Sequence, residues 1–256
     1  MPLICLDTVP ESIQVNVPLH VILPDLGRQD KLENYPVLFL LHGLTDDSSA
    51  WVRYSNIETV ARELGFCVVM PTVGRSFYAD MLNGQAYFTY VTEELPAYLR
   101  QVFKFNLEKE NTLIAGNSMG GYGAFKCAVL KPEQYRAALS LSGLLMMNLN
   151  LLPPDKAANP ALLHEVGMIY GGLDKVENSP NDTFVWLQMI AENPTVYPQM
   201  TAICGAQDDL VDMNRFYAKV AESMNVPLTY IENEGTHTWP YWQAQLESWL
   251  CQQLSK

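Results

Sequence analysis

A serine that could act as a nucleophile stands in the pattern G-x-S-x-G, formed by Gly-Asn-Ser-Met-Gly at residues 116–120. The apolar run from Asn111 to Ala115 is typical of a buried strand, and the residues from Tyr122 to Leu130 favour a helix. A strand-to-helix turn at Ser118 would lift its hydroxyl clear of a sheet, and small residues on either side let strand and helix approach each other. The pattern therefore predicts a serine nucleophile for acyl transfer.

A serine needs a base, and the chain has four histidines. His20 falls inside an early strand pattern and is expected to be a packing or edge residue, whereas His164 lies in an insertion and is expected to be solvated. His42 ends a central apolar run, where its ring would brace an oxyanion loop. His237 falls between the last predicted strand and the last predicted helix, so we predict that it is the general base.

The base in turn needs an acid that fixes its tautomer and stabilises the imidazolium formed during acyl transfer. Asp208 and Asp209 follow a predicted strand and give the chain order Ser, Asp, His. We favour Asp208 because it is nearer the strand end, with Asp209 and Asp212 as alternatives. These acids could instead only stabilise the N-terminus of the next helix, by about 0.3–1 kcal/mol.

The tetrahedral intermediate of acyl transfer carries a negative oxygen, which requires backbone donors that are already in place. The N–H of Met119, directly after the serine, is one predicted donor. The second is expected from the loop at residues 42–44, where we favour Leu44 over Gly43.

Predicted strands and helices alternate along nearly the whole chain, which favours a mainly parallel sheet with helices on both faces. Ile13 to Leu23 alternates apolar and polar residues and predicts antiparallel strands near the start. The other predicted strands are 35–41, 65–71, 111–115, 136–141, 200–204 and 228–231. The predicted helices include one with a capping box at Ser55 and Glu58 and a stop at Gly65, and others at 92–105, 213–224 and 239–250.

We predict one domain over residues 1–256, because no linker or charge block divides the chain. An insertion at about 143–197 could form a cap over the serine. Its apolar runs at 144–147, 149–152 and 183–190 are more typical of core than of a pocket. Arg75, Tyr78 and Asp80 could reach the mouth of the cleft or belong to a solvated loop.

The composition argues against several kinds of partner and site. A net charge of -12 disfavours nucleic acid and anionic membrane surfaces as partners. We see no membrane span and no secretion signal. The five cysteines are odd in number and lack C-x-x-C spacing, which favours reduced thiols in a cytoplasmic protein over disulfides or a metal site.

The motifs resemble those of the esterase D group of α/β-hydrolases, and within it the bacterial tributyrin esterases, which are carboxylesterases related to S-formylglutathione hydrolases. The resemblance rests on three segments, Leu-His-Gly-Leu-Thr at 41–45, residues 116–124 around Ser118, and Gly-Thr-His-Thr-Trp at 235–239, and it extends through 74–80 and 90–96. It implies the α/β-hydrolase fold, a triad of Ser118, Asp208 and His237, and an oxyanion hole from Leu44 and Met119. It also implies activity on short-chain acyl esters without metal or organic cofactor.

We therefore expect a serine carboxylesterase that forms an acyl-enzyme. The same triad could serve an S-formylglutathione hydrolase, another thioesterase or an acyltransferase. A binding protein that kept the fold without catalysis is a further alternative. Exposed apolar residues in the insertion lead us to expect a homo-oligomer.

Overall fold

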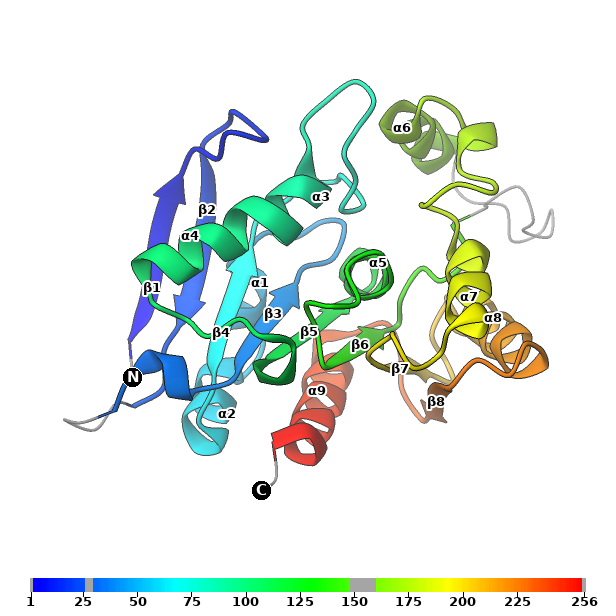
Figure 1. Ribbon diagram of the computed structural model, residues 1–256. Coiled ribbons are helices and arrows are strands. Elements are labelled where there is room, and N and C mark those ends of the chain that lie inside the picture. Colours follow the sequence, from blue (N-terminus) through cyan, green and yellow to red (C-terminus); the bar gives the residue numbers. More distant parts are fainter. Residues whose placement is uncertain (1, 26–29, 148–159, 255–256) are drawn as a thin grey trace.

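The computed structural model describes residues 2–25, 30–147 and 160–254 (Figure 1). Within these ranges, eight strands form one sheet in the order β1-β2-β4-β3-β5-β6-β7-β8. Strands β3 to β8 are parallel, whereas β2 is antiparallel to both β1 and β4. The strands are β1 Leu3–Thr8, β2 Val17–Ile22, β3 Val37–Leu41, β4 Cys67–Pro71, β5 Thr112–Asn117, β6 Ala137–Leu141, β7 Gln199–Gly205 and β8 Leu228–Asn233.

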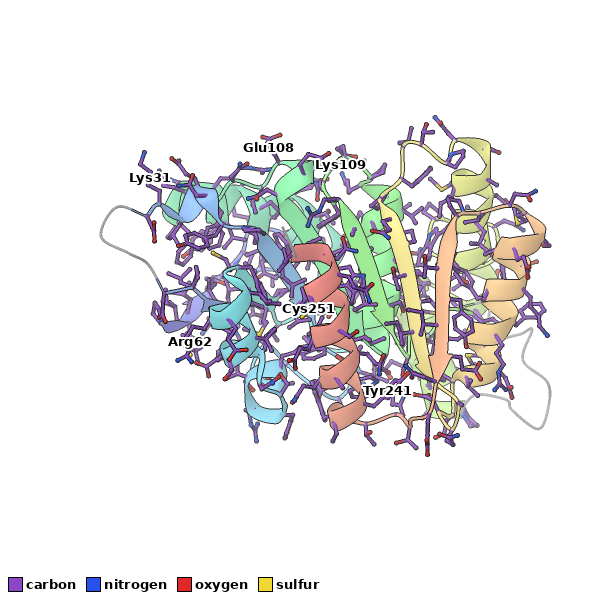
Figure 2. The ribbon with its side chains drawn as sticks, turned by 90° about the horizontal axis from the view of Figure 1, so that it is seen from below. Lys31, Arg62, Glu108, Lys109, Tyr241 and Cys251 are labelled. Carbon is purple, nitrogen blue, oxygen red and sulfur yellow. The ribbon has the colours of Figure 1, made fainter. Side chains whose placement is uncertain are left out.

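Helices cover both faces of this sheet. One face carries α1 (Ala50–Tyr54), α2 (Ile57–Leu64) and α9 (Trp239–Leu254), and Figure 2 looks onto this face with α9 across it. The other face carries α3 to α8 (Figure 1). These helices are α3 Tyr87–Thr89, α4 Leu95–Val102, α5 Met119–Leu130, α6 Pro160–Tyr170, α7 Thr183–Glu192 and α8 Val211–Ser223. The chain therefore has a mainly parallel α/β architecture, as the sequence predicted.

Strand β3 shows why the apolar runs of the sequence are continuous. All five of its residues are buried. Val37, Phe39 and Leu41 join the core beneath α3 to α8, whereas Leu38 and Leu40 join the core beneath α1, α2 and α9. A strand with helices on both faces has no polar side, so its sequence does not alternate.

The predicted capping box is wrong. Helix α2 begins after Asn56, whose side chain makes no capping bond. The Ser55 hydroxyl donates to the Trp51 carbonyl of α1 and accepts from the Ile57 N–H, and not from the Glu58 N–H that a capping box requires. Gly65 does end α2, in the left-handed conformation with φ +70°.

The helix predicted at 92–105 has different bounds. Helical backbone begins at Tyr87 and ends at Val102, and a wide π-helical turn, η2 (Tyr90–Glu94), joins α3 to α4. Leu95 donates to the Tyr90 carbonyl across this turn. Pro96 has no N–H to donate to the preceding turn, and a wider turn accommodates that missing bond.

The insertion contains α6, which the sequence pattern did not predict, and α7, which it did predict near 183–190. Residues 144–147 are buried, as expected of core, whereas the run at 149–152 lies outside the described residues. In the described ranges, no helix is both long and apolar enough to cross a bilayer.

Candidate active site

Ser118 occupies the turn between β5 and α5. Its backbone lies at φ +54° and ψ −118°, a conformation that a residue with a side chain rarely adopts. Its N–H donates to Leu141 at the end of β6, at 2.9 Å. The structure thus forms the sharp turn that the G-x-S-x-G pattern predicts, with the serine side chain half-buried.

The flanking glycines permit this turn because they have no Cβ, so that the start of α5 can lie close to β5 and β3. A Cβ on Gly116 would overlap the carbonyl of Gly120, and a Cβ on Gly120 would overlap the carbonyl of Leu41 in β3. The start of α5 therefore lies directly against two strand ends, and any side chain at these positions would push the serine away from the sheet.

His237 lies in the loop between β8 and α9 and contacts both predicted partners. Its Nε2 is 3.1 Å from Ser118 Oγ, and its Nδ1 is 2.9 and 3.0 Å from the two carboxylate oxygens of Asp208. Because a carboxylate can only accept, we place the ring proton on Nδ1, which donates to Asp208. Nε2 then accepts from the serine hydroxyl. This arrangement can transfer the serine proton to the imidazole.

Asp208 lies after β7, and its side chain is fully buried. Burial raises its pKa, but hydrogen bonds from His237, the Leu210 N–H and Ser142 outweigh that effect and hold the pKa below its ordinary value. The carboxyl group is therefore ionised at neutral pH. Asp209 is exposed, and Asp212 forms an ion pair with Arg215 at 3.2 Å, so neither alternative acid contacts the histidine.

The two predicted oxyanion donors lie at the start of α5 and in the loop after β3. Met119 is the first residue of α5, so its N–H has no acceptor within the helix. Leu44 follows the end of β3 in a turn closed by the bond from the Asp46 N–H to the Gly43 carbonyl, at 3.2 Å. Neither N–H donates to another group in the described chain.

His42 braces this turn from inside the protein. Its Nδ1 donates to the Gly43 carbonyl at 2.7 Å, and its Nε2 accepts from the Val73 N–H at 3.1 Å. Burial lowers the pKa of His42 to about 4, so the ring is neutral and can make both bonds. Tyr78 was expected either at the cleft mouth or in a solvated loop, and both expectations are wrong. It is fully buried, and its hydroxyl donates to the His42 carbonyl at 3.0 Å.

Among the contacts between the insertion and the body of the molecule, two involve residues near the proposed site. Arg75, in the loop after β4, donates through two nitrogens to the Glu165 carboxylate on α6. Trp186 of α7 packs against Tyr122 of α5 with ring centroids 5.0 Å apart. Asp80 accepts from the backbone and hydroxyl of Thr89, so it fixes its own loop.

The remaining histidines lie where the sequence suggested. His20 is in β2, and its Nδ1 is 2.9 Å from the Ser48 hydroxyl, whereas His164 is exposed on α6. Across the described residues, no group of three or more His, Cys, Asp and Glu side chains is arranged to hold a metal ion.

Two residues near the site were missed by the sequence analysis. Trp242 contacts the His237 ring, and its indole nitrogen donates to the Ser142 hydroxyl at 3.1 Å. A serine after a strand and a tryptophan in an apolar helix pattern look like ordinary core residues, so no sequence signal distinguishes them.

Comparison with known families gives one match over most of the chain. The esterase family, described as "Putative esterase", matches residues 11–251. This range includes all the residues of the predicted triad and oxyanion hole.

Individual relatives agree with this family. An acetyl esterase of Caldicellulosiruptor saccharolyticus is 26% identical over 92% of both chains. Two solved structures from Staphylococcus aureus are each 28% identical, covering 99% of this chain and 98% of theirs. They are the substrate-bound fluorophosphonate-binding serine hydrolase FphF, with a TM-score of 0.87, and the S-formylglutathione hydrolase FrmB, with a TM-score of 0.85.

Proposed function

Because the chain belongs to the esterase family and is a carboxylic ester hydrolase, we propose that it is a serine carboxylesterase acting through Ser118, His237 and Asp208. The observation that carries this proposal is the position of His237, which contacts the Ser118 hydroxyl on one side and the Asp208 carboxylate on the other. This arrangement supports a reaction in two halves, with an acyl-enzyme between them.

In the first half, Ser118 Oγ attacks the ester carbonyl as its proton passes to His237 Nε2. The buried carboxylate of Asp208 stabilises the imidazolium that forms. The N–H groups of Leu44 and Met119 donate to the carbonyl oxygen as it becomes negative. When the tetrahedral intermediate collapses, His237 gives its proton to the departing alcohol, and the acyl group remains on the serine.

In the second half, water replaces the alcohol. His237 removes a proton from the water, the resulting hydroxide attacks the acyl carbonyl, and the same two N–H groups again hold the oxyanion. The carboxylic acid then leaves, and Ser118 recovers its proton. The two N–H groups stabilise the oxyanion, and the Asp208 carboxylate stabilises the imidazolium. We therefore propose a reaction without a metal or organic cofactor.

We propose short-chain acyl esters as substrates, with tributyrin-esterase-like specificity. The resemblance of the motifs around Ser118 to the tributyrin esterases supports this choice, and so does the similarity to an acetyl esterase. A panel that varies acyl length and alcohol separately tests it. A kcat/KM that rises steadily towards long acyl chains would overturn the short-chain assignment.

The central experiment replaces Ser118. Ser118→Ala removes the nucleophile, so kcat for p-nitrophenyl acetate should fall by about 10⁶-fold, as in other Ser-His-Asp enzymes. A serine-directed phosphonate should form one covalent adduct, at Ser118 of the folded wild-type protein. Wild-type activity in Ser118→Ala, with the protein folded, would exclude this serine as the nucleophile.

Thioester hydrolysis is the second candidate, favoured by the 28% identity to an S-formylglutathione hydrolase over nearly the full length. Glutathione carries two carboxylates, and a chain of net charge -12 offers it little electrostatic attraction. Comparing kcat/KM for S-formylglutathione, triacetin and tributyrin separates the two candidates. A large preference for the glutathione thioester would favour the second.

We also propose that residues 1–256 form one domain in which the insertion at 143–197 caps the active site. The ion pair between Arg75 and Glu165 supports this arrangement, because it joins α6 to the loop after β4. We further propose a cytoplasmic location, from the cysteine pattern, and a homo-oligomeric state, from the apolar residues of the insertion. Light scattering tests the oligomeric state.

A further inference from the structure

Three tryptophan rings form a row that ends on the proposed base. Trp51 packs edge-to-face on Trp239 at 5.0 Å, Trp239 on Trp242 at 5.3 Å, and Trp242 on the His237 ring at 4.8 Å. The interplanar angles are 85°, 81° and 88°. Perpendicular aromatic contacts of this kind are favourable and directional, so each ring restricts the tilt of the next.

Both ends of the row are fixed to the sheet by indole nitrogens. Trp51 Nε1 donates to the carbonyl of Leu41, the last residue of β3, at 3.1 Å. Trp242 Nε1 donates to the hydroxyl of Ser142, directly after β6, also at 3.1 Å. Trp51 and Trp242 are 1% and 5% exposed, so water does not compete for these bonds. The ring that contacts His237 therefore has a defined orientation.

Ser142 is itself held firmly. It is buried, its backbone lies at φ +47°, and its N–H donates to the Ile203 carbonyl of β7 at 2.8 Å. Its oxygen accepts a hydrogen bond from the indole N–H of Trp242, and Ser142 is also among the groups that lower the pKa of Asp208. The indole that contacts His237 is therefore bonded to a residue whose own backbone is fixed to β7.

His237 needs such support because its loop leaves it partly open. Its side chain is 31% exposed, and the bonds from Nδ1 to Asp208 fix the ring along one direction only. Rotation about that direction would turn Nε2 away from Ser118 Oγ. The Trp242 ring packs perpendicular to the imidazole at a centroid distance of 4.8 Å, so this rotation would disturb that contact.

We propose that Trp242 is a positioning residue for His237, and that the Ser142 hydroxyl anchors its indole. This inference rests on the proposed function. It assigns no chemical step to Trp242 or Ser142, since neither touches the reacting atoms. Their effect is to keep Nε2 directed at the serine hydroxyl and then at the leaving group.

The alternative is that Trp242 only fills the core, and the chain offers a matched control for that case. Trp249 lies on the same helix, is 3% exposed, and its indole nitrogen has no hydrogen-bond partner in the described chain. Trp242→Phe and Trp249→Phe therefore remove the same atoms from similarly buried sites. Only the first variant removes an anchored ring beside His237.

For Trp242→Phe we expect kcat for p-nitrophenyl acetate to fall about 10-fold with KM nearly unchanged, because a small misplacement of the base slows the chemical steps. Trp249→Phe should keep kcat within about twofold of wild type, whatever its effect on Tm. A kcat in Trp242→Phe equal to that in Trp249→Phe would overturn the proposal.

The anchoring role of Ser142 is tested by a double-mutant cycle. Ser142→Ala should lower kcat about as much as Trp242→Phe, and the double variant should lose little more than either, because both changes release the same indole. Losses that multiply to about 100-fold would show independent effects and exclude the anchor. If Trp242→Phe does not fold, Ser142→Ala alone still tests the proposal, because it releases the same indole.

A spectroscopic measurement is independent of turnover. The Nδ1 proton shared by His237 and Asp208 should give a downfield proton resonance in wild type and Trp249→Phe, and a broadened or missing one in Trp242→Phe. A sharp, unshifted resonance in all three proteins would overturn the proposal. Failure of the proposed function would appear differently, as a fully active Ser118→Ala protein or as wild type without a phosphonate adduct.

Discussion

At the scale of single residues, two adjacent acids with the same chemistry differ in what they contact. Asp208 is buried and bonded to His237, whereas Asp209 is exposed. Asp208→Asn should lower kcat on the order of 10⁴-fold, because an amide can hold the imidazole in the wrong tautomer. Asp209→Asn is the matched control and should stay within about twofold. Stopped-flow hydrolysis of p-nitrophenyl acetate measures both, and equal effects would remove Asp208 from the proposed triad.

His42 should make stability depend on pH. Its pKa in the folded protein is lowered to about 4, below its ordinary 6.5. Between these values the unfolded chain binds a proton that the folded chain does not, so the free energy of unfolding falls as pH falls from about 6.5 to 4. The loss from this group is on the order of 3 kcal/mol.

Urea unfolding of wild type and His42→Gln at several pH values measures this contribution. The stability difference between the two proteins should be largest above pH 6.5, where the stabilisation is fully present, and should shrink towards pH 4. His164→Gln, at an exposed position on α6, is the control. A difference that stays constant with pH would contradict the neutral, doubly bonded state of His42.

At the scale of elements, the position of α5 against β3 depends on the absence of a side chain at Gly120. An added Cβ would overlap the carbonyls of Leu41 and His42, which cannot move without breaking the oxyanion turn. Gly120→Ala should therefore destabilise the protein by about 3 kcal/mol or more. Chemical denaturation measures the change, and a near-neutral result would mean that helix and strand can separate easily.

Gly167 on α6 provides the opposite case. No atom lies within 4 Å of a Cβ added there. Gly167→Ala should stabilise the protein by about 0.5–1 kcal/mol through helix propensity alone. Comparing Gly120→Ala with Gly167→Ala therefore separates the steric effect of a new Cβ from the effect of replacing a glycine in a helix.

The same elements show what a sequence can predict. Strand β3 and the turn at Ser118 were predictable because a strand buried on both faces and a tight elbow each demand a narrow set of residues. The capping box at Ser55 failed because α2 begins one residue later, after Asn56, and the Ser55 hydroxyl joins the Trp51 carbonyl to the Ile57 N–H, which the S-x-x-E pattern does not encode. The buried role of Tyr78 also depends on packing, since its ring lies against Gly123 of α5, and no local pattern shows this.

At the scale of the whole molecule, the parallel sheet gathers residues that are distant in the chain. Ser118, Asp208 and His237 follow β5, β7 and β8, and His42 follows β3. Because parallel strands end at the same edge of a sheet, the order of motifs in the sequence was enough to predict which residues meet. The distance and angle at which they meet depend on the packing of α9 and its tryptophans, which the sequence does not reveal.

The whole fold should also control which thiols react. Cys67, Cys127 and Cys204 are buried, and burial raises the pKa of each to about 12, so these thiols carry almost no reactive thiolate at neutral pH. Cys5 and Cys251 are exposed. Ellman's reagent should therefore titrate two thiols in the native protein and all five after unfolding. A Cys5→Ser/Cys251→Ser variant should titrate none until it unfolds, and it should keep its esterase activity because the proposed nucleophile is a serine. Rapid reaction of any buried thiol in the native state would contradict the packing around the sheet. Loss of activity in the double variant would indicate a role for a cysteine that the geometry at Ser118 does not include.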